Sequence, residues 1–390
     1  MKFDSSIGVL ALVPDAWDDI VMPRHQVLKR LACHFQVVWV DPQKGWREYY
    51  LPSGQHFLEG DRWRSPSEGV EVFTPGLRHA RVLRPSLLRH ASLKALCSTA
   101  RHRLLDRGVK RVVLYLWRDE FAEALDAVEH DLSCYHLDDE YSFDERDGPI
   151  STRESNLLQR VDEVIVHSVG LEAKKGAINP HTVRIPNGVD YTAFATPQIE
   201  PADLADIARP RIGYAGVIKR QLDLALMARL ARARPNYSFV FVGPEMNMVG
   251  KEQSLCELKS LPNVFFLGAK PADALPSYMQ HFDVCLMCYD VNGYTKYIHP
   301  LKLSEYLATG RPTVSSPIDS VQDFSSVVML ARSDTEWLDA ISYSLKPESL
   351  TLAAVAARQK VAREHDWDIL VDRIAVLFRD GLARIAGNVR

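Results

Sequence analysis

The sequence lacks an apolar run long enough to cross a membrane. The longest early run, Ile7 to Val13, falls well short of the roughly 20 residues that a transmembrane helix needs, and no signal-peptide cleavage region follows it. No G-x-G-x-x-G follows this run, which disfavours an enzyme that binds a dinucleotide. Ribonucleoprotein, KH and zinc-finger patterns are missing as well, which disfavours nucleic-acid binding. We therefore expect a cytoplasmic protein whose ligands are neither dinucleotides nor nucleic acids.

Cysteine is scarce, and its spacing indicates no site. Cys285-Leu-Met-Cys288 has a C-x-x-C spacing, but it lies inside an apolar run, and no second pair stands at zinc-finger distance. Thiols in such surroundings pack as small apolar groups more often than they react or bind a metal. The sequence predicts core cysteines rather than a redox or metal centre.

Charge is nearly balanced over the whole chain, with a formal net charge of −3, but one segment is strongly basic. Residues 74–111 hold ten lysines and arginines against the single acid Asp106, with leucines interleaved. A basic, leucine-rich helix can lie on an anionic membrane surface, and we expect a peripheral contact with the inner face of the cytoplasmic membrane. The alternatives are a solvated helix face whose leucines pack inward, and a nucleic-acid patch, for which stacking aromatics are missing.

The length of 390 residues, with 46% hydrophobic and 25% charged residues, fits two globular domains. Strand-like and helix-like patterns alternate in two series, and this alternation predicts an α/β fold with two parallel, doubly wound sheets. Ligands of such sheets bind beyond the carboxyl ends of the strands. We predict a first domain over 1–190, a linker over 191–210, a second domain over 211–365 and a terminal helix over 366–390. The predicted strands are 7–13, 36–40, 112–116, 132–137, 163–167, 183–185, 211–216, 238–242, 263–267, 283–287 and 313–315.

The stretch 294–312 predicts a loop, a helix and a stop. Pro300 suits the first helical position, and Gly310 suits the left-handed residue that ends a helix. The periodicity predicts a buried stripe made of Leu303, Tyr306, Leu307 and Gly310.

Lys302 and Glu305 lie on a different stripe of the same helix. Free N–H groups and a lysine at a helix start favour an anion, and a glutamate accepts hydrogen bonds from hydroxyls. A ligand that has a phosphate beside two hydroxyls, as a nucleotide sugar does, would fit this pair of side chains. The alternative is a surface Lys–Glu pair worth about 0.3 kcal/mol.

Two further groups follow predicted strands. Gly216 ends the strand 211–216, and Lys219-Arg220 comes next, so backbone and cations can approach a diphosphate leaving group. Asp138-Asp139-Glu140 follows the strand 132–137, where a carboxylate can deprotonate a hydroxyl. The alternatives are solvated cations at a helix start and a loop cluster of acids.

Several pieces of the chain together resemble one family. In their order and spacing they resemble GT-B glycosyltransferases of the group 1 type, and the form around Glu305 is similar to bacterial transferases of teichuronic acid and exopolysaccharide synthesis. The resemblance implies two Rossmann-like domains with an inter-domain cleft, the first for the acceptor and the second for the donor. The pieces are Arg184-Ile-Pro-Asn-Gly-Val-Asp190, Gly213-Tyr-Ala-Gly216, Phe239-Val-Phe-Val-Gly243 and His299-Pro-Leu-Lys-Leu-Ser-Glu-Tyr-Leu-Ala-Thr-Gly-Arg-Pro312.

The resemblance implies transfer of a sugar from an NDP-sugar, with UDP the expected nucleotide, to a hydroxyl of a lipid-linked or polysaccharide acceptor in bacterial surface glycan synthesis. Asp139 and Asp138 are the catalytic candidates, as a base if the enzyme inverts the anomeric centre or as binding groups if it retains it. Glu305 matches the family glutamate that contacts the donor's ribose or sugar. The other donor-binding candidates are Lys302, Lys219, Arg220, Gly216, Tyr294, Thr295 and His299.

Two features of the family pattern bear on its chemistry. The group 1 pattern usually has a second glutamate eight positions before Glu305, and here that residue is Tyr297, so the choice of sugar would fall to the loop 294–299. GT-B enzymes use helix ends and basic side chains where GT-A enzymes use an Asp-x-Asp metal site. The resemblance therefore implies no metal and no cofactor, although Asp366-Trp-Asp368 is a literal match in the predicted helical tail. The residues implied to pack back on the first domain are Trp367, Ile369, Leu370, Ile374, Val376 and Leu377.

Two rival functions stay open. Non-hydrolysing UDP-GlcNAc 2-epimerases share the fold and the donor, but they give no reason for the basic, leucine-rich segment. A non-catalytic protein that binds sugar nucleotides is the second rival. Product analysis with UDP-GlcNAc and no acceptor would separate the isomerase from the transferase.

Overall fold

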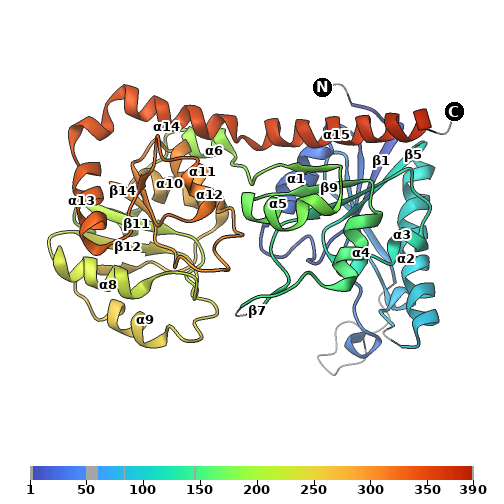
Figure 1. The fold of residues 1–390 in the computed structure, drawn as a ribbon, viewed down its shortest axis with the longest axis horizontal. Helices are drawn as coiled ribbons and strands as arrows, with labels where there is room; N and C mark the ends of the chain where they lie inside the picture. Colours follow the sequence, from blue (N-terminus) through green and yellow to red (C-terminus); the bar gives the residue numbers. More distant parts are fainter. Residues whose placement is uncertain (1–2, 50–59, 83, 145, 389–390) are drawn as a thin grey trace.

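The computed structural model describes residues 3–49, 60–82, 84–144 and 146–388. Figure 1 shows two α/β domains side by side, with a long C-terminal helix running from one to the other. Each domain is built on a sheet of parallel strands that is covered by helices on both faces. The predicted α/β class and doubly wound architecture are confirmed.

The sheet of the first domain has the strand order β10-β9-β6-β5-β1-β2-β4-β3. Neighbouring strands are parallel, except that β3 and β4 form an antiparallel edge. A separate small hairpin pairs β7 (Phe143–Asp144) with β8 (Arg146–Asp147). The main strands are β1 (Ile7–Leu12), β2 (Gln36–Val40), β3 (Arg62–Ser67), β4 (Val70–Thr74), β5 (Arg111–Leu116), β6 (Leu132–Leu137), β9 (Glu163–Val166) and β10 (Thr182–Arg184).

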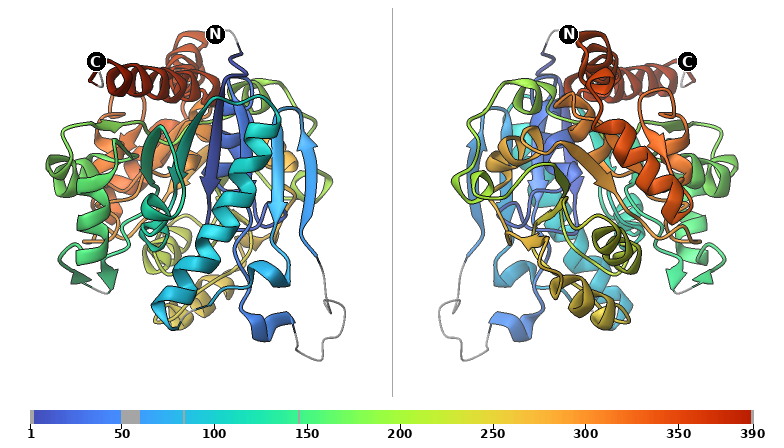
Figure 2. Two further views of the ribbon diagram at one scale, coloured as in Figure 1. Left: turned by 90° about the vertical axis from the view of Figure 1, so that its right-hand side faces the viewer. Right: turned by 90° about the vertical axis from the view of Figure 1, so that its left-hand side faces the viewer.

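Two helical layers bury this sheet. One face packs against α1 and α15, and the other packs against α2 and α4. Strands that are covered on both faces read as continuous apolar runs, which is why the sequence showed them clearly. The left view of Figure 2 shows α2 lying diagonally across the sheet. The helices are α1 (Pro23–Leu31), α2 (Ser86–Asp106), α3 (Ala124–Ala127), α4 (Thr152–Arg160), α5 (Val169–Lys175) and α15 (Trp367–Asn388).

The second domain has the strand order β13-β12-β11-β14-β15-β16, with every pairing parallel. Its strands are β11 (Arg211–Ala215), β12 (Ser238–Val242), β13 (Val264–Phe266), β14 (Val284–Met287), β15 (Thr313–Ser315) and β16 (Met329–Leu330). Its helices are α8 (Leu224–Ala233), α9 (Glu252–Lys259), α10 (Leu275–Gln280), α11 (Leu301–Ala308), α12 (Asp319–Gln322), α13 (Asp334–Ser344) and α14 (Leu352–Glu364). As predicted, Cys285 and Cys288 are buried in its core.

The segment predicted as a linker belongs to the second domain. It contains α6 (Tyr191–Ala195) and α7 (Ala202–Ala205), and Phe194, Leu204 and Ile207 are buried in the core of that domain. The sequence did not predict this packing, because these three apolar residues are too widely spaced in a Pro- and Ala-rich segment to form a periodic pattern.

The chain crosses between the domains at two adjacent places. The Val189 N–H donates to the carbonyl of His365 at 3.0 Å, and the Trp367 N–H donates to the carbonyl of Val189 at 2.9 Å. From there α15 returns to the first domain, where Trp367, Leu370 and Ile374 are buried as expected. Ile369, which was expected to join them, is exposed.

Candidate active site

The helix α11 occupies the position that the sequence predicted. Pro300 is its N-cap rather than its first residue, and Gly310 follows it with a φ of +75°, the left-handed conformation that favours glycine. The side chain of Tyr306 faces inward, and its hydroxyl accepts a hydrogen bond from the Ala215 N–H at 2.8 Å. This bond holds α11 against the carboxyl end of β11, which points Lys302 and Glu305 toward the same edge of the sheet.

Lys302 is held between two tyrosines. Its Nζ donates to the Tyr289 hydroxyl at 2.9 Å and lies 5.3 Å from the ring centroid of Tyr214 and 5.5 Å from that of Tyr289. Burial alone would lower the pKa of Lys302, but Tyr289 and Glu305 outweigh it and hold the pKa above its ordinary value. Cation–π contacts of this kind fix a lysine in its charged form. Sequence reasoning missed both tyrosines, because aromatics at strand ends give no periodic signal.

Glu305 lies one turn beyond Lys302. Burial raises the pKa of its carboxyl group to about 7, and the charge of Lys302 only partly opposes this effect. None of the described residues donates a hydrogen bond to its carboxylate. The group is therefore a desolvated acceptor without a protein donor, which suits the hydroxyls of a ligand.

Two glycines let backbone and lysine come close together. Gly216 has a φ of +137°, and a Cβ atom there would lie 2.8 Å from Cε of Lys302. Gly243 has a φ of +143°, and a Cβ atom there would lie 2.1 Å from the carbonyl oxygen of Gly216. Side chains at either position would displace the chain from the space beside Lys302. Gly243 was not among the predicted site residues.

Lys219 shares the electrostatic surroundings of Lys302. Burial lowers the pKa of Lys219, the nearby charge of Lys302 lowers it further, and Asp139 of the first domain acts in the opposite sense. Within the described part of the chain no acid forms an ion pair with Lys219. Two lysines that repel one another favour an anion between them. The side chain of the neighbouring Arg220 is exposed. Its backbone N–H donates to the backbone carbonyl of Asn247 at 3.2 Å.

Asp139 of the first domain lies in the electrostatic surroundings of Lys219. Its Oδ1 accepts a hydrogen bond from the Glu140 N–H at 2.8 Å, and its Oδ2 accepts one from the hydroxyl of Tyr294 at 3.1 Å. Burial raises the pKa of Asp139, while these two hydrogen bonds lower it. Within the predicted loop 294–299, Tyr294 is thus the residue that reaches Asp139.

Asp138 is occupied elsewhere, contrary to its expected catalytic role. Its Oδ2 lies 3.1 Å from the guanidinium of Arg24, and its Oδ1 accepts a hydrogen bond from the hydroxyl of Tyr141. Arg24 is buried and also pairs with Asp15 at 2.9 Å. Asp138 is thus part of an ion-pair and hydrogen-bond network with Arg24 and Tyr141, and removal of one partner from such a buried network is costly.

Thr295 and His299 also depart from the expected donor contacts. Thr295 is fully buried, and its hydroxyl donates to the carbonyl of Asp290 at 2.7 Å. His299 is buried against a separate cavity of about 230 Å³, which Arg184 and Phe324 also line, and burial lowers the pKa of His299 to about 3. Both side chains are buried beneath the loop 294–299.

Tyr297 occupies the place of the family's second glutamate. Its ring is buried in the core of the first domain, and its hydroxyl donates to Asp147. The hydroxyl of Ser168 donates to the carbonyl of Tyr297 at 2.6 Å. Tyr297 therefore fastens the loop to the first domain and does not face the donor side.

His167, expected to be structural, lies in the electrostatic neighbourhood of Asp138 and Asp139. One ring nitrogen, Nδ1, lies 3.0 Å from the carbonyl of Leu137, which fixes the plane of the ring. Burial lowers the pKa of His167, with the Leu137 contact and the two acids opposing it. The position of His167 directly after β9 is the sequence feature that could have indicated its place near the two aspartates.

The Asp-x-Asp match makes structural contacts. Asp366 accepts a hydrogen bond from the Tyr191 N–H at 3.0 Å, and Asp368 pairs with Arg30 at 2.6 Å. Over the described ranges no group of three or more His, Cys, Asp or Glu side chains is placed to hold a metal ion.

The two doubly wound domains have the architecture of the GT-B fold, which the solved structures described below share. Residues 209–346 match the family of group 1 glycosyl transferases, so the second domain is a group 1 glycosyltransferase domain and the predicted resemblance is confirmed.

Individual relatives agree with this class. The chain is 28% identical over 236 residues to TuaH of Bacillus subtilis (strain 168), a candidate teichuronic acid biosynthesis glycosyltransferase, and the match covers 58% of each protein. The chain thus spans little more than half of that relative.

Solved structures resemble nearly the whole fold. The trehalose-6-phosphate synthase OtsA is 13% identical, with a TM-score of 0.69 over 95% of this chain and 99% of that one. The synthase of Burkholderia multivorans is 15% identical, with a TM-score of 0.64 over 98% of both chains. TarM is also 15% identical, with a TM-score of 0.52 over 68% of this chain and 54% of that one.

Proposed function

We propose that this protein is a glycosyltransferase that moves a sugar from a UDP-sugar to a hydroxyl of a lipid-linked or polysaccharide acceptor in bacterial surface glycan synthesis. The observation that carries the proposal is the hydrogen bond from Tyr294 to Asp139 at 3.1 Å, which brings Asp139 of the first domain into the electrostatic surroundings of Lys219 and Lys302. The likeness to TuaH supports the glycan pathway, and a similar E. coli structure bound to UDP-2-fluoro glucose supports the nucleotide.

The donor would be held by the second domain. Lys219 and Lys302 neutralise the diphosphate, and Gly216 lets the backbone approach it. Glu305 accepts hydrogen bonds from the hydroxyls of the ribose. As the bond between the anomeric carbon and the diphosphate oxygen breaks, negative charge grows on that oxygen, and the two cations stabilise it.

The acceptor would approach from the first domain. Its hydroxyl oxygen forms the new bond to the anomeric carbon, and its proton passes to Asp139 if the configuration inverts. If the configuration is retained, the departing diphosphate oxygen takes the proton and Asp139 orients the acceptor. Burial raises the pKa of Asp139, which makes it a stronger base than an ordinary aspartate.

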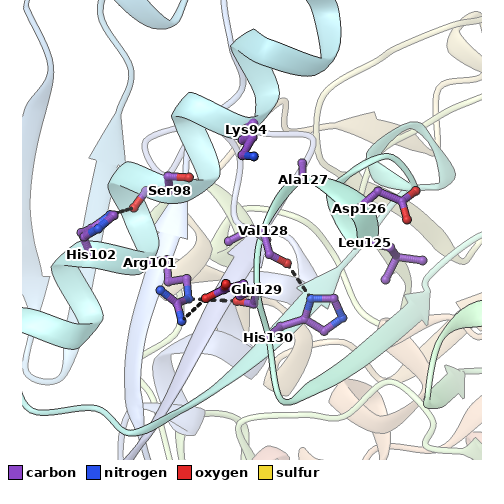
Figure 3. Close-up of a pocket in the computed structure, with 10 residues that line it drawn as sticks. All are labelled: Lys94, Ser98, Arg101, His102, Leu125, Asp126, Ala127, Val128, Glu129 and His130. Atoms are coloured by element: carbon purple, nitrogen blue, oxygen red, sulfur yellow. Dashed lines mark hydrogen bonds and ion pairs between the residues drawn. The ribbon is translucent and has the colours of Figure 1, made fainter. Parts of the chain in front are cut away.

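Fewer basic residues of the segment 74–111 are available for a membrane contact than the sequence predicted. Most arginines of the segment 74–111 meet acids from other parts of the fold, as Figure 3 shows for Arg101 and Glu129 beside an open pocket of about 630 Å³. The other pairs are Arg78 with Asp61, Arg89 with Glu123, and Arg103 and Arg107 with Glu71. Five of the ten basic residues of this segment are therefore paired with acids, and about half of the predicted positive charge is neutralised.

Two of the cations that have no acid partner among the described residues, Arg84 and Lys94, lie just before α2 and within its first half, near two exposed leucines. Leu87 is 82% exposed and Leu88 is 55% exposed, and no acid among the described residues pairs with the exposed Arg84 or Lys94. Exposed leucines beside free cations suit the interface of an anionic bilayer. No described helix is long and apolar enough to cross a membrane.

Nucleotide release from a panel of NDP-sugars tests the transferase proposal. We expect UDP to be released from one UDP-sugar only when a glycan or lipid-linked acceptor is present. Appearance of an epimerised sugar without acceptor would favour the isomerase instead, and binding without turnover of any donor would favour the non-catalytic rival.

Flotation with phosphatidylglycerol liposomes tests the membrane contact. We expect the wild type to float at low salt and the Leu87→Glu, Leu88→Glu double variant to remain in the lower fraction. Leu352→Glu, at a 90% exposed site in the second domain, is the matched control and should float like the wild type. Absence of wild-type flotation would remove this part of the proposal.

A further inference from the structure

A pocket of about 320 Å³ opens among the loops of the first domain that follow the carboxyl ends of β5 and β6. Arg118, which follows β5, and Tyr141, which follows β6, line one part of it, and the start of α4 lines another. The Tyr141 hydroxyl bonds to Asp138, the residue before Asp139. The pocket is therefore connected to the proposed base through Tyr141 and Asp138, although neither Asp138 nor Asp139 lines it.

Arg118 is held in place but uses none of its hydrogen-bond donors. Its guanidinium carbon lies 3.8 Å from the ring centroid of Tyr141, so the ring fixes the guanidinium. No described residue pairs with its N–H groups, either as an acid or as a carbonyl. A guanidinium that is fixed on an aromatic ring with its N–H groups free is prepared for an oxyanion that offers two oxygens, such as a carboxylate or a phosphate, which it can bind through two parallel hydrogen bonds.

The neighbouring ionic groups are already paired, so they do not account for Arg118. Asp119 pairs with Arg153 at 2.7 Å, and Glu154 pairs with the buried Lys175 at 2.7 Å. Glu120 is exposed and forms no ion pair with Arg118. Arg118 is therefore the cation of this pocket that has no acid partner within the described residues.

We propose that Arg118 binds an oxyanion on the acceptor, and that the acceptor is an acidic molecule. The oxyanion is the carboxylate of a uronic acid sugar or the phosphate of a lipid-linked glycan. This inference rests on the proposed function, because only a transferase has an acceptor substrate. Binding of an anion at Arg118 can be tested without turnover. Arg118 acts on specificity by binding the substrate and takes no part in proton transfer.

Calorimetric titration of the UDP-saturated protein tests the anion site. The probes are methyl β-glucuronide against methyl β-glucoside for the sugar carboxylate, and octyl phosphate against octanol for the lipid phosphate. We expect one of the two anions to bind at least about tenfold more tightly than its neutral partner. Arg118→Gln should abolish this preference, and Arg118→Lys should keep only part of it because a lysine does not offer the planar fork.

The controls separate this inference from the proposed function. Arg160→Gln removes an arginine that pairs with Asp126 outside the pocket, and it should keep the full preference for the anion. UDP affinity should be equal in all four proteins. The inference is overturned if neither anion is preferred by the wild type, or if Arg118→Gln retains the preference. Loss of UDP binding by the wild type would instead count against the donor site and the proposed function.

Discussion

The hydroxyl of Tyr294, from the second domain, donates a hydrogen bond to Oδ2 of Asp139, in the first domain, at 3.1 Å. The bond links the loop before α11 to the edge of the acceptor domain. It also stabilises the charged form of Asp139 against the effect of burial. The protonation state of the proposed base therefore depends on the relative position of the two domains.

The first prediction concerns this hydrogen bond. In Tyr294→Phe the pKa of Asp139 rises, because a bond to its charged form is lost while its burial remains. The acid limb of the kcat/KM profile should move to higher pH, and activity at pH 7 should fall by about three- to tenfold. A pH series from 5 to 9 measures the shift. Tyr343→Phe, at an exposed tyrosine of α13, is the control, and an unmoved acid limb in Tyr294→Phe would show that Asp139 is not the titrating group.

The second prediction separates the two adjacent aspartates. Asp139→Asn should lower transfer by about 10²- to 10⁴-fold if Asp139 is the base, with UDP affinity and melting temperature kept. Asp138→Asn should instead lower stability by about 2 kcal/mol, because the buried Arg24 loses one of its two acids. Urea unfolding and nucleotide release on both variants measure the contrast. Equal loss of activity without loss of stability in both would contradict the assignment.

The third prediction uses the raised pKa of Glu305. An acid whose folded pKa is above its unfolded value binds more protons when folded, so it contributes less stability as the pH rises from about 4.5 toward 7. Glu305→Gln should therefore stabilise the ligand-free protein above pH 7 by roughly 1–2 kcal/mol, after allowance for its partial exposure, and leave it unchanged at pH 4.5. The same variant should bind a UDP-sugar about tenfold more weakly.

Thermal melting at pH 4.5 and pH 8 checks the stability part, with Glu364→Gln at the end of α14 as a control. A variant that is destabilised at pH 8 would show that the Glu305 carboxylate has a protein partner after all.

The fourth prediction concerns the two lysines. The pKa of Lys219 is lowered, so its charge should be lost at a lower pH than for an ordinary lysine, and UDP affinity should decline over that range as the pH rises. Lys219→Gln should remove this step and weaken UDP binding by about tenfold at pH 7.5. Titrations of UDP between pH 7 and pH 10 test it. Lys270→Gln, at a lysine paired with Asp203, should keep both the affinity and the step.

Patterns within one element could be predicted from the sequence, and relations between distant segments could not. The buried stripe of α11 and its end at Gly310 follow from spacing, and both are present. Which of Asp138 and Asp139 stays free depends on Arg24, which is 114 residues away from Asp138.

The basic segment 74–111 shows the same limit. Its acids come from positions such as Glu71 and Glu129, outside the segment, so a local sum of charges overstated the positive surface. Tyr297 is a related case, because its burial in the other domain's core depends on the contact between the domains.

The return of α15 to the first domain also sets an order for biosynthesis. The core of the first domain includes Trp367 and Phe378, which are synthesised after the whole second domain, so the first domain stays unfinished on one face until α15 has been made. The second domain is continuous from α6 to α14 and can close its core earlier. The part of the molecule made first is therefore completed last, and a chain released before Trp367 would carry an open apolar face that invites aggregation.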